Sequence, residues 1–148
     1  MRVAVVSDIH SNLAAFEAII ADFGEVDEVW CIGDVVGYGP DPNECVRRLR
    51  GFPHICVAGN HDWASVGKVS ADVFNSDARA AATWTGEQLT AASRDYLRGL
   101  PPRVEREGWT IVHGSPRDPI WEYVLRTWQA SACFGMFTTP GCFIGHSF

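Results

Sequence analysis

Residues 2–13 read RVAVVSDIHSNL, and this stretch contains the change of pattern on which the fold depends. The apolar run at 2–7 predicts a buried strand, because a short continuous run rich in valine is typical of one. A polar DIH triplet ends the run, and Ser11 is a suitable N-cap for a helix over 12–23 that stops at Gly24. The chain therefore begins with a strand, a short polar turn and an amphipathic helix.

The same alternation continues through the rest of the 148 residues. Further strands are predicted at 27–32, 54–58, 103–106, 109–113 and 141–145. Further helices are predicted at 42–50 behind the N-cap Asp41, as a pair within 75–99 broken near Gly86 or Thr90, and as one or two within 119–134. Strands that alternate with helices indicate an α/β layered fold, and the length suits one domain over 1–148.

Polar side chains follow five of these strands at the point where each strand ends. The motifs are DIH after the first strand, GDVVG after the second, GNHD after the third, HGS after the fifth and GH after the last. In α/β sheets, ligands bind beyond the carboxyl ends of the strands. The residues delivered there are Asp8, His10, Asp34, Asn60, His61, His113 and His146.

These residue types favour a pair of divalent metal ions. Carboxylates and imidazoles suit borderline divalent ions, and no cysteine lies in any of the five motifs, which argues against a structural thiolate zinc site. Two ions about 3.5–4 Å apart can share a carboxylate, activate a water and stabilise an in-line displacement at phosphorus. A neighbouring histidine that is not a ligand can then protonate the leaving oxygen.

Composition excludes several other classes of protein. The net charge of −6 disfavours a nucleic-acid surface, because neutralising phosphates requires a basic face. Five scattered cysteines without a C-x-x-C motif indicate free, mostly buried thiols and a reducing compartment, so we expect a cytoplasmic protein. No apolar run reaches the roughly 18 residues of a membrane span. Oligomeric state is not readable from these features.

The motifs D-x-H, G-D-x-x-G, G-N-H-D, H-G and G-H-x, in this order, resemble those of the calcineurin-like metallophosphoesterases along the whole chain. The longer strings GDVVGYGPDPNE at 33–44, AGNHDW at 58–63 and VHGSPRDPIWEY at 112–123 are similar to small single-domain bacterial members. The resemblance implies a four-layer α-β-β-α sandwich with metal ions at the strand ends.

The resemblance also implies a role for each motif residue. Asp8 and His10 match ligands of a first ion, Asn60, His113 and His146 match ligands of a second, Asp34 matches the carboxylate that bridges them, and His61 matches the proton donor. The ions would be Mn, Fe, Zn, Co or Ni, with Mn or Fe favoured. The implied activity is hydrolysis of phosphate mono- or diesters by attack of a dimetal-bound hydroxide.

The end of the chain departs from the family pattern. The family motif is G-H-x-H, and Phe148 occupies the position of its second histidine, a ligand of the first ion. Family chains also continue beyond this point, so we expect residues 1–148 to lack the C-terminal part of the domain. Both departures keep open a second function, a binding or scaffold module that has the fold but is catalytically impaired.

Four polar residues near the motifs have two possible roles each. Arg117 would bind a substrate phosphate or form an ion pair with Asp118 or Glu122. Tyr38 would line the substrate cleft or only shape a turn between glycines. Asp62 would orient His61 or cap a helix. His54 is expected to be a satisfied polar residue rather than a ligand.

Overall fold

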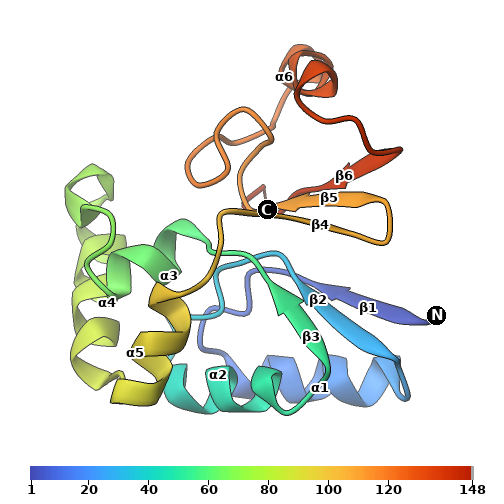
Figure 1. Cartoon of the computed structure of the whole chain (residues 1–148). Helices are drawn as coiled ribbons and strands as arrows, with labels where there is room; N and C mark the ends of the chain where they lie inside the picture. The colour runs from blue at the N-terminus through green and yellow to red at the C-terminus, as the bar shows by residue number, and fades with distance from the viewer. Residues whose placement is uncertain (148) are drawn as a thin grey trace.

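The computed structural model describes residues 1–147, and Phe148 lies outside the described residues. Its first sheet contains three parallel strands in the order in which they occur in the chain (Figure 1). They are β1 (Val3–Val6), β2 (Glu28–Cys31) and β3 (His54–Cys56). Parallel strands need crossover helices, and the helices that follow β1 and β2 supply them.

Two helices cover the outer face of the first sheet, and three more lie beside it (Figure 1). The covering helices are α1 (Leu13–Phe23) and α2 (Pro42–Arg50). The others are α3 (Asn60–Ser65), α4 (Ser76–Gln88) and α5 (Ala91–Arg98), with a 3₁₀ turn at Ala71–Val73 before α4. The predicted break within 75–99 falls at Thr90, whose side chain caps α5.

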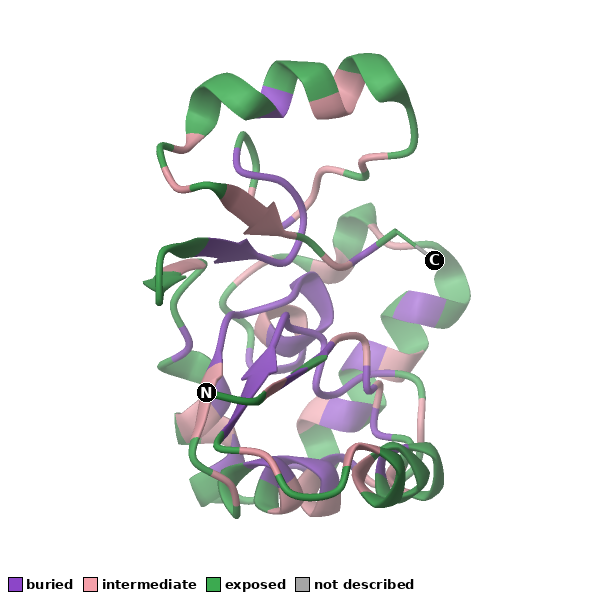
Figure 2. Cartoon of the chain, turned by 90° about the vertical axis from the view of Figure 1, so that its right-hand side faces the viewer, coloured by how far each residue is buried: buried purple, intermediate pink, exposed green. Residues whose placement is uncertain are grey.

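The second sheet faces the first and is mixed. It contains β4 (Arg103–Arg106), β5 (Trp109–Val112) and β6 (Gly141–Phe143), with β4 antiparallel and β6 parallel to β5. On its far side lie α6 (Thr127–Cys133) and a 3₁₀ turn at Phe134–Met136 (Figure 1). Figure 2 shows that α6 is largely exposed. The layers are helix, sheet, sheet and helix, so the predicted fold class is confirmed.

The two faces of β2 hold the layers together. Its residues alternate, so Val29 and Cys31 join a core between the first sheet and the helices, with Phe16 and Leu49. Trp30 points to the opposite face and belongs to a second core between the sheets. All four residues of β2 are buried, as expected for a central strand covered on both sides. This buried strand fixes the position of the loop that follows it.

Two local predictions were wrong. Asn12, not Ser11, caps α1, because its side chain accepts the N–H of Ala15, while Ser11 is buried in the loop before the helix. The helical region predicted within 119–134 shrinks to α6 and the 3₁₀ turn, and the side chains of Asp118 and Gln129 bind N–H groups of the loop before α6 instead. Among these, Asp118 accepts the N–H of Trp121 over 3.1 Å.

All five cysteines are free, and four of them are buried, as predicted. Within residues 1–147, no helix has both the length and the apolar character needed to cross a membrane.

Candidate metal centre

The seven residues predicted from the strand-end motifs lie together where the two sheets meet. Five of them form two groups of three potential ligands, with Asp34 in both groups, and Asn60 and His61 lie beside these groups. Five of the seven are buried, and Asp8 and His10 are partly exposed at one side. The structure thus brings these residues together, while their roles as ligands remain predictions.

The first group consists of Asp8, His10 and Asp34. Nε2 of His10 lies 3.7 Å from Oδ1 of Asp8 and 3.6 Å from Oδ2 of Asp34. The other ring nitrogen of His10, Nδ1, is 3.2 Å from the carbonyl oxygen of Val36, an arrangement that holds the ring by its far side. The three side chains therefore present oxygen and nitrogen atoms to one point.

The second group consists of Asp34, His113 and His146, with Asn60 beside them. Nε2 of His113 is 3.3 Å from Oδ2 of Asp34, 3.2 Å from Oδ1 of Asn60 and 3.2 Å from Nδ1 of His146. Nδ1 of His113 lies 2.7 Å from the carbonyl oxygen of Ile32, so the peptide before Gly33 orients this ring. The same oxygen of Asp34 faces both groups.

Several polar atoms of the centre lack the partners that buried polar atoms usually have. Among residues 1–147, Oδ1 of Asp8, Nδ1 of His61 and Nε2 of His146 are buried and make no hydrogen bond. Buried polar atoms are normally satisfied, so such a concentration of them in one place needs an explanation. A pair of cations bound among carboxylates and imidazoles would supply it, and the donor set fits borderline divalent ions.

The backbone of the centre adopts an uncommon conformation after three of the strands, β1, β2 and β6. Asp8, His10, Asp34 and His146 have positive φ angles of 54°, 48°, 52° and 62°. This left-handed region is costly for residues other than glycine, and such outliers cluster at functional sites. The chain turns sharply there, so that side chains from consecutive short motifs point to the same place.

Two glycines allow the motifs to approach one another. A Cβ atom at Gly59 would collide with the carboxylate of Asp34. One at Gly37, where φ is +99°, would lie 2.8 Å from Nδ1 of His61. Only glycine fits in these positions, which explains the glycines of the GDVVG and GNHD motifs.

Asp62 fastens these two motifs to each other. The carboxylate accepts the N–H of Val36 over 3.1 Å and the N–H of Gly59 over 3.0 Å, and it is fully buried. The second of these bonds is half of a capping box at the start of α3, a helix that was not predicted. Of its two possible roles, the structure shows the cap.

The ring of His61 lies in an apolar setting at the edge of the centre. It stacks on Phe74, with ring centroids 4.6 Å apart and 24° between the planes, and it contacts Tyr38 at 4.6 Å. Burial lowers the pKa of His61 to about 4, against the opposing charge of Asp34. At neutral pH the imidazole is uncharged, and a bound phosphate anion would raise this pKa by favouring the imidazolium.

Asp34 and His113 influence each other strongly. Burial by itself would raise the pKa of Asp34, but His113 and the other nearby imidazoles lower it below its ordinary value. Burial by itself would lower the pKa of His113, and Asp34 reverses this effect and raises it. The carboxylate is therefore ionised, as a bridging ligand must be.

Arg117 and His54, whose roles the sequence left open, both have partners away from the metal centre. Arg117 forms an ion pair with Glu122, whose carboxylate also accepts the hydroxyl of Ser115, so the ion-pair alternative is the one observed. His54 is satisfied, with Nδ1 2.8 Å from the carbonyl oxygen of Phe52 and Nε2 2.9 Å from the hydroxyl of Tyr96. The substrate contact predicted for Arg117 would require its guanidinium to leave Glu122.

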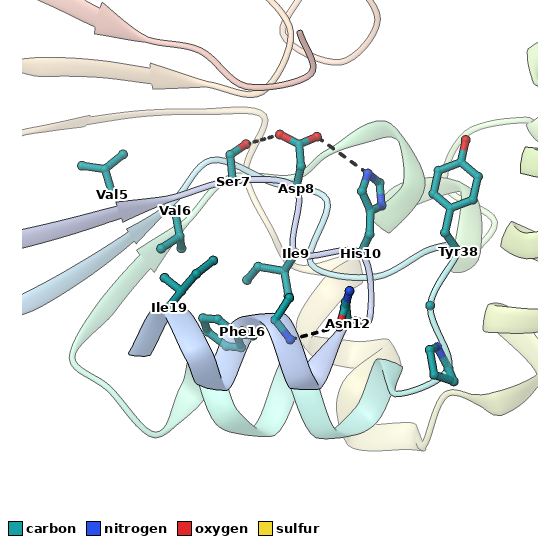
Figure 3. A pocket seen from close by; sticks show the side chains of 13 residues that line it. Val5, Val6, Ser7, Asp8, Ile9, His10, Asn12, Phe16, Ile19 and Tyr38 are labelled. Carbon is teal, nitrogen blue, oxygen red and sulfur yellow. Dashed lines mark hydrogen bonds and ion pairs between the residues drawn. The ribbon is translucent and has the colours of Figure 1, made fainter. Parts of the chain in front are cut away.

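Tyr38 lies beside the centre, as one of its two predicted roles requires. Its ring contacts His10 edge to face at 5.0 Å, and it lines a cavity of about 650 Å³ that includes Asp8. Figure 3 shows the side chains of Asp8, His10 and Tyr38 pointing to one side of the chain, and Val6 and Phe16 to the other. The cavity opens from the first ligand group.

Sequence reasoning missed three side chains that touch the centre. Ser7 donates a hydrogen bond to Oδ2 of Asp8. Phe74 stacks on His61, as described above, and Tyr123 stacks on His146 with ring centroids 3.7 Å apart and 23° between the planes. Ser7 adjoins a motif and could have been suspected. The two aromatic contacts are long-range, and no local pattern announces them.

The chain is similar in sequence and structure to known proteins. A model of the calcineurin-like phosphoesterase family matches residues 1–135, and the chain belongs to this family. A metallophosphoesterase from Sphaerobacter thermophilus is 52% identical, with a TM-score of 0.87 over 99% of this chain and 60% of that chain. An uncharacterised protein of Methanocaldococcus jannaschii is 40% identical over 130 residues, which cover 83% of this chain and 54% of that protein.

A shorter match connects the chain to an enzyme with a named substrate. The symmetrical bis(5'-nucleosyl)-tetraphosphatase of Pseudomonas putida is 46% identical over 39 residues, or 25% of this chain and 14% of that protein. The chain spans 54% to 60% of the length of the two longer relatives. The family is named for phosphoesterases, and the two ligand groups described above are candidate sites for divalent metal ions.

Proposed function

We propose that residues 1–148 belong to a single domain that hydrolyses phosphate mono- or diesters with the help of two divalent metal ions. The observation that supports this most directly is the position of Oδ2 of Asp34, which faces His10 at 3.6 Å and His113 at 3.3 Å. A single carboxylate oxygen between two ligand groups is the arrangement that a bridging ligand needs.

The proposed ligands divide between the two groups. Asp8 and His10 would hold one ion, Asn60, His113 and His146 would hold the other, and Asp34 would contact both. When bound, such ions supply positive charge that polarises phosphoryl oxygens and makes a water more acidic. Mn or Fe is favoured among the ions that this donor set accepts.

His61 is the proposed proton donor. Its ring lies at the edge of the centre and belongs to neither ligand group. Its backbone N–H donates a hydrogen bond to Asp34. A phosphate ester bound at the centre would place its oxygens near this ring and raise its affinity for a proton. The imidazole can then deliver the proton to the leaving oxygen.

The substrate of this chain is a separate question. Diadenosine tetraphosphate belongs in any test panel, because a stretch of the chain is similar to a bis(5'-nucleosyl)-tetraphosphatase. Simple aryl monoesters and diesters belong there as well, since they report the reaction type without assuming a natural substrate.

The decisive experiment combines metal binding with turnover. Calorimetric titration of metal-free protein with Mn²⁺ is expected to show two sites per chain, and the loaded protein is expected to hydrolyse 4-nitrophenyl phosphate or bis(4-nitrophenyl) phosphate. Binding of two ions without hydrolysis of any ester in the panel would favour the scaffold alternative. Failure to bind metal would overturn the proposal.

A further inference from the structure

Four aromatic side chains surround the proposed metal centre, and we refer to Tyr38, Phe74, Trp121 and Tyr123 as the aromatic rim. They come from three separate loops, and three of them connect through rings: Tyr38 contacts His61, Phe74 stacks on the same imidazole, and Trp121 meets Phe74 edge to face at 5.6 Å. Tyr123, from the same loop as Trp121, covers His146.

The two tyrosines of the rim are about half exposed to solvent. Tyr38 is 52% exposed and Tyr123 is 50% exposed, although each packs closely on an imidazole of the centre. Packing on the imidazoles uses only part of the apolar area of each ring. Each tyrosine therefore has atoms available for a further contact beside the centre.

We propose that the aromatic rim makes this centre selective for phosphate esters whose alcohol part carries a flat aromatic ring. The inference rests on the proposed function, because it assumes that the phosphorus atom lies at the metal centre. The alcohol part of an ester then extends past the centre toward its edge, where the exposed tyrosine rings lie. Tyr38 and Tyr123 would be the specificity-determining residues.

The chemistry of the rim explains why the ring should be aromatic. Aromatic pairs gain more than their buried area alone provides, because their quadrupoles favour offset and edge-to-face contacts. Stacking of this kind accepts any flat ring, so nucleobases and simple aryl groups share it. Arg117, one of two arginines in the loop that carries Trp121 and Tyr123, is paired with Glu122.

A matched pair of ligands isolates the effect of the ring. Benzylphosphonate and cyclohexylmethylphosphonate have nearly the same size and the same charged group, and only one has an aromatic ring. For the Mn²⁺-loaded protein, we expect benzylphosphonate to bind about 2- to 12-fold more tightly in calorimetry, the range that an aromatic pair contributes. This readout does not depend on turnover.

Variants then assign the preference to the rim. Tyr38→Leu and Tyr123→Leu are expected to bring the affinity ratio close to 1, whereas Tyr38→Phe and Tyr123→Phe should keep it. Trp84→Leu is the matched control, because Trp84 is a 41% exposed aromatic residue of α4 outside the rim. Metal content is measured for every variant, since Tyr123 also supports His146.

Turnover measurements show whether the preferred ring is a simple aryl group or a nucleobase. Together with the binding data, they also test the selectivity of the rim separately from the proposed enzymatic function. Benzyl phosphate against cyclohexylmethyl phosphate tests an aryl ring, and adenosine 5'-monophosphate against ribose 5-phosphate tests a nucleobase. Equal affinity for the two phosphonates in the unaltered protein would overturn the inference and leave the proposed function standing. A clear phosphonate preference without hydrolysis of any ester would support the rim and count against the enzyme.

Discussion

The backbone N–H of His61 donates a hydrogen bond to Oδ1 of Asp34 over 2.9 Å. The residue proposed as proton donor therefore also holds the carboxylate proposed as bridge, but through its backbone and not through its ring. Oδ1 is occupied by this bond, and Oδ2 is left to face both ligand groups. Two substitutions can separate these contributions.

Asp34→Asn is expected to remove both ions. The amide can keep the bond to the N–H of His61 through its oxygen, but it then presents an NH₂ group, a donor, where Oδ2 faced the two ligand groups. Metal content measured by plasma mass spectrometry should fall from two ions per chain toward none. Asp95→Asn, on the exposed surface of α5, is the control and should retain the ions.

His61→Ala is expected to lower kcat by about 10²–10⁴-fold, the usual contribution of one general acid or base. The backbone N–H remains, so the bond to Asp34 persists and both ions should stay bound. The measurement is steady-state hydrolysis together with metal content. Metal loss as large as that in Asp34→Asn would show that the ring, too, is needed to assemble the centre.

Asp62→Ala is expected to destabilise the fold by about 2–5 kcal/mol, because it leaves two buried N–H donors unpaired at about 1–3 kcal/mol each. These donors belong to Val36 and Gly59. Urea unfolding of the metal-free protein gives the free energy of unfolding. Asp95→Ala should change it by no more than about 0.5 kcal/mol, and an equally small change at Asp62 would contradict the role as a cap.

The contacts of Glu28, which lies away from the metal centre, should make the free energy of unfolding depend on pH. The pKa of Glu28 lies below the ordinary value of 4.5 because Trp30 donates a hydrogen bond to it and Arg106, on the facing sheet, forms an ion pair with it. A lowered folded-state pKa stabilises the protein above the unfolded value, and this stabilisation is lost as the pH falls through the folded one. Glu28→Gln should therefore cost stability at pH 7 and progressively less below pH 4.5. A difference that is constant down to pH 3 would contradict this.

The thiols, four of them buried and that of Cys142 partly buried, should react slowly in the folded protein. Burial raises the pKa of Cys45 to about 12 and that of Cys142 to about 11, so little thiolate is present at pH 8. A colorimetric thiol reagent should find few reactive groups in the native protein and all five after unfolding in urea. Rapid native labelling of Cys45 would show that the core opens locally.

Local sequence patterns predicted the strands and the polar residues at their ends, because each strand and the motif after it consist of consecutive residues. The buried run of β2 and the GDVVG motif after it occur together in the sequence, and the strand end is where the structure has Asp34. Residues 119–126 were wrongly predicted to be helical, because their conformation depends on single side chains such as that of Asp118, which binds nearby backbone N–H groups. The contact of Phe74 with His61 joins distant segments, so no local periodicity could reveal it.

The left-handed backbone of Asp8, His10, Asp34 and His146 has a consequence for the stability of the chain. Each of these residues adopts a conformation that glycine would adopt at about 1 kcal/mol less. The backbone at these four positions therefore carries a cost that a glycine would not have. On the proposed function, aspartate and histidine at these four positions exchange backbone stability for metal binding.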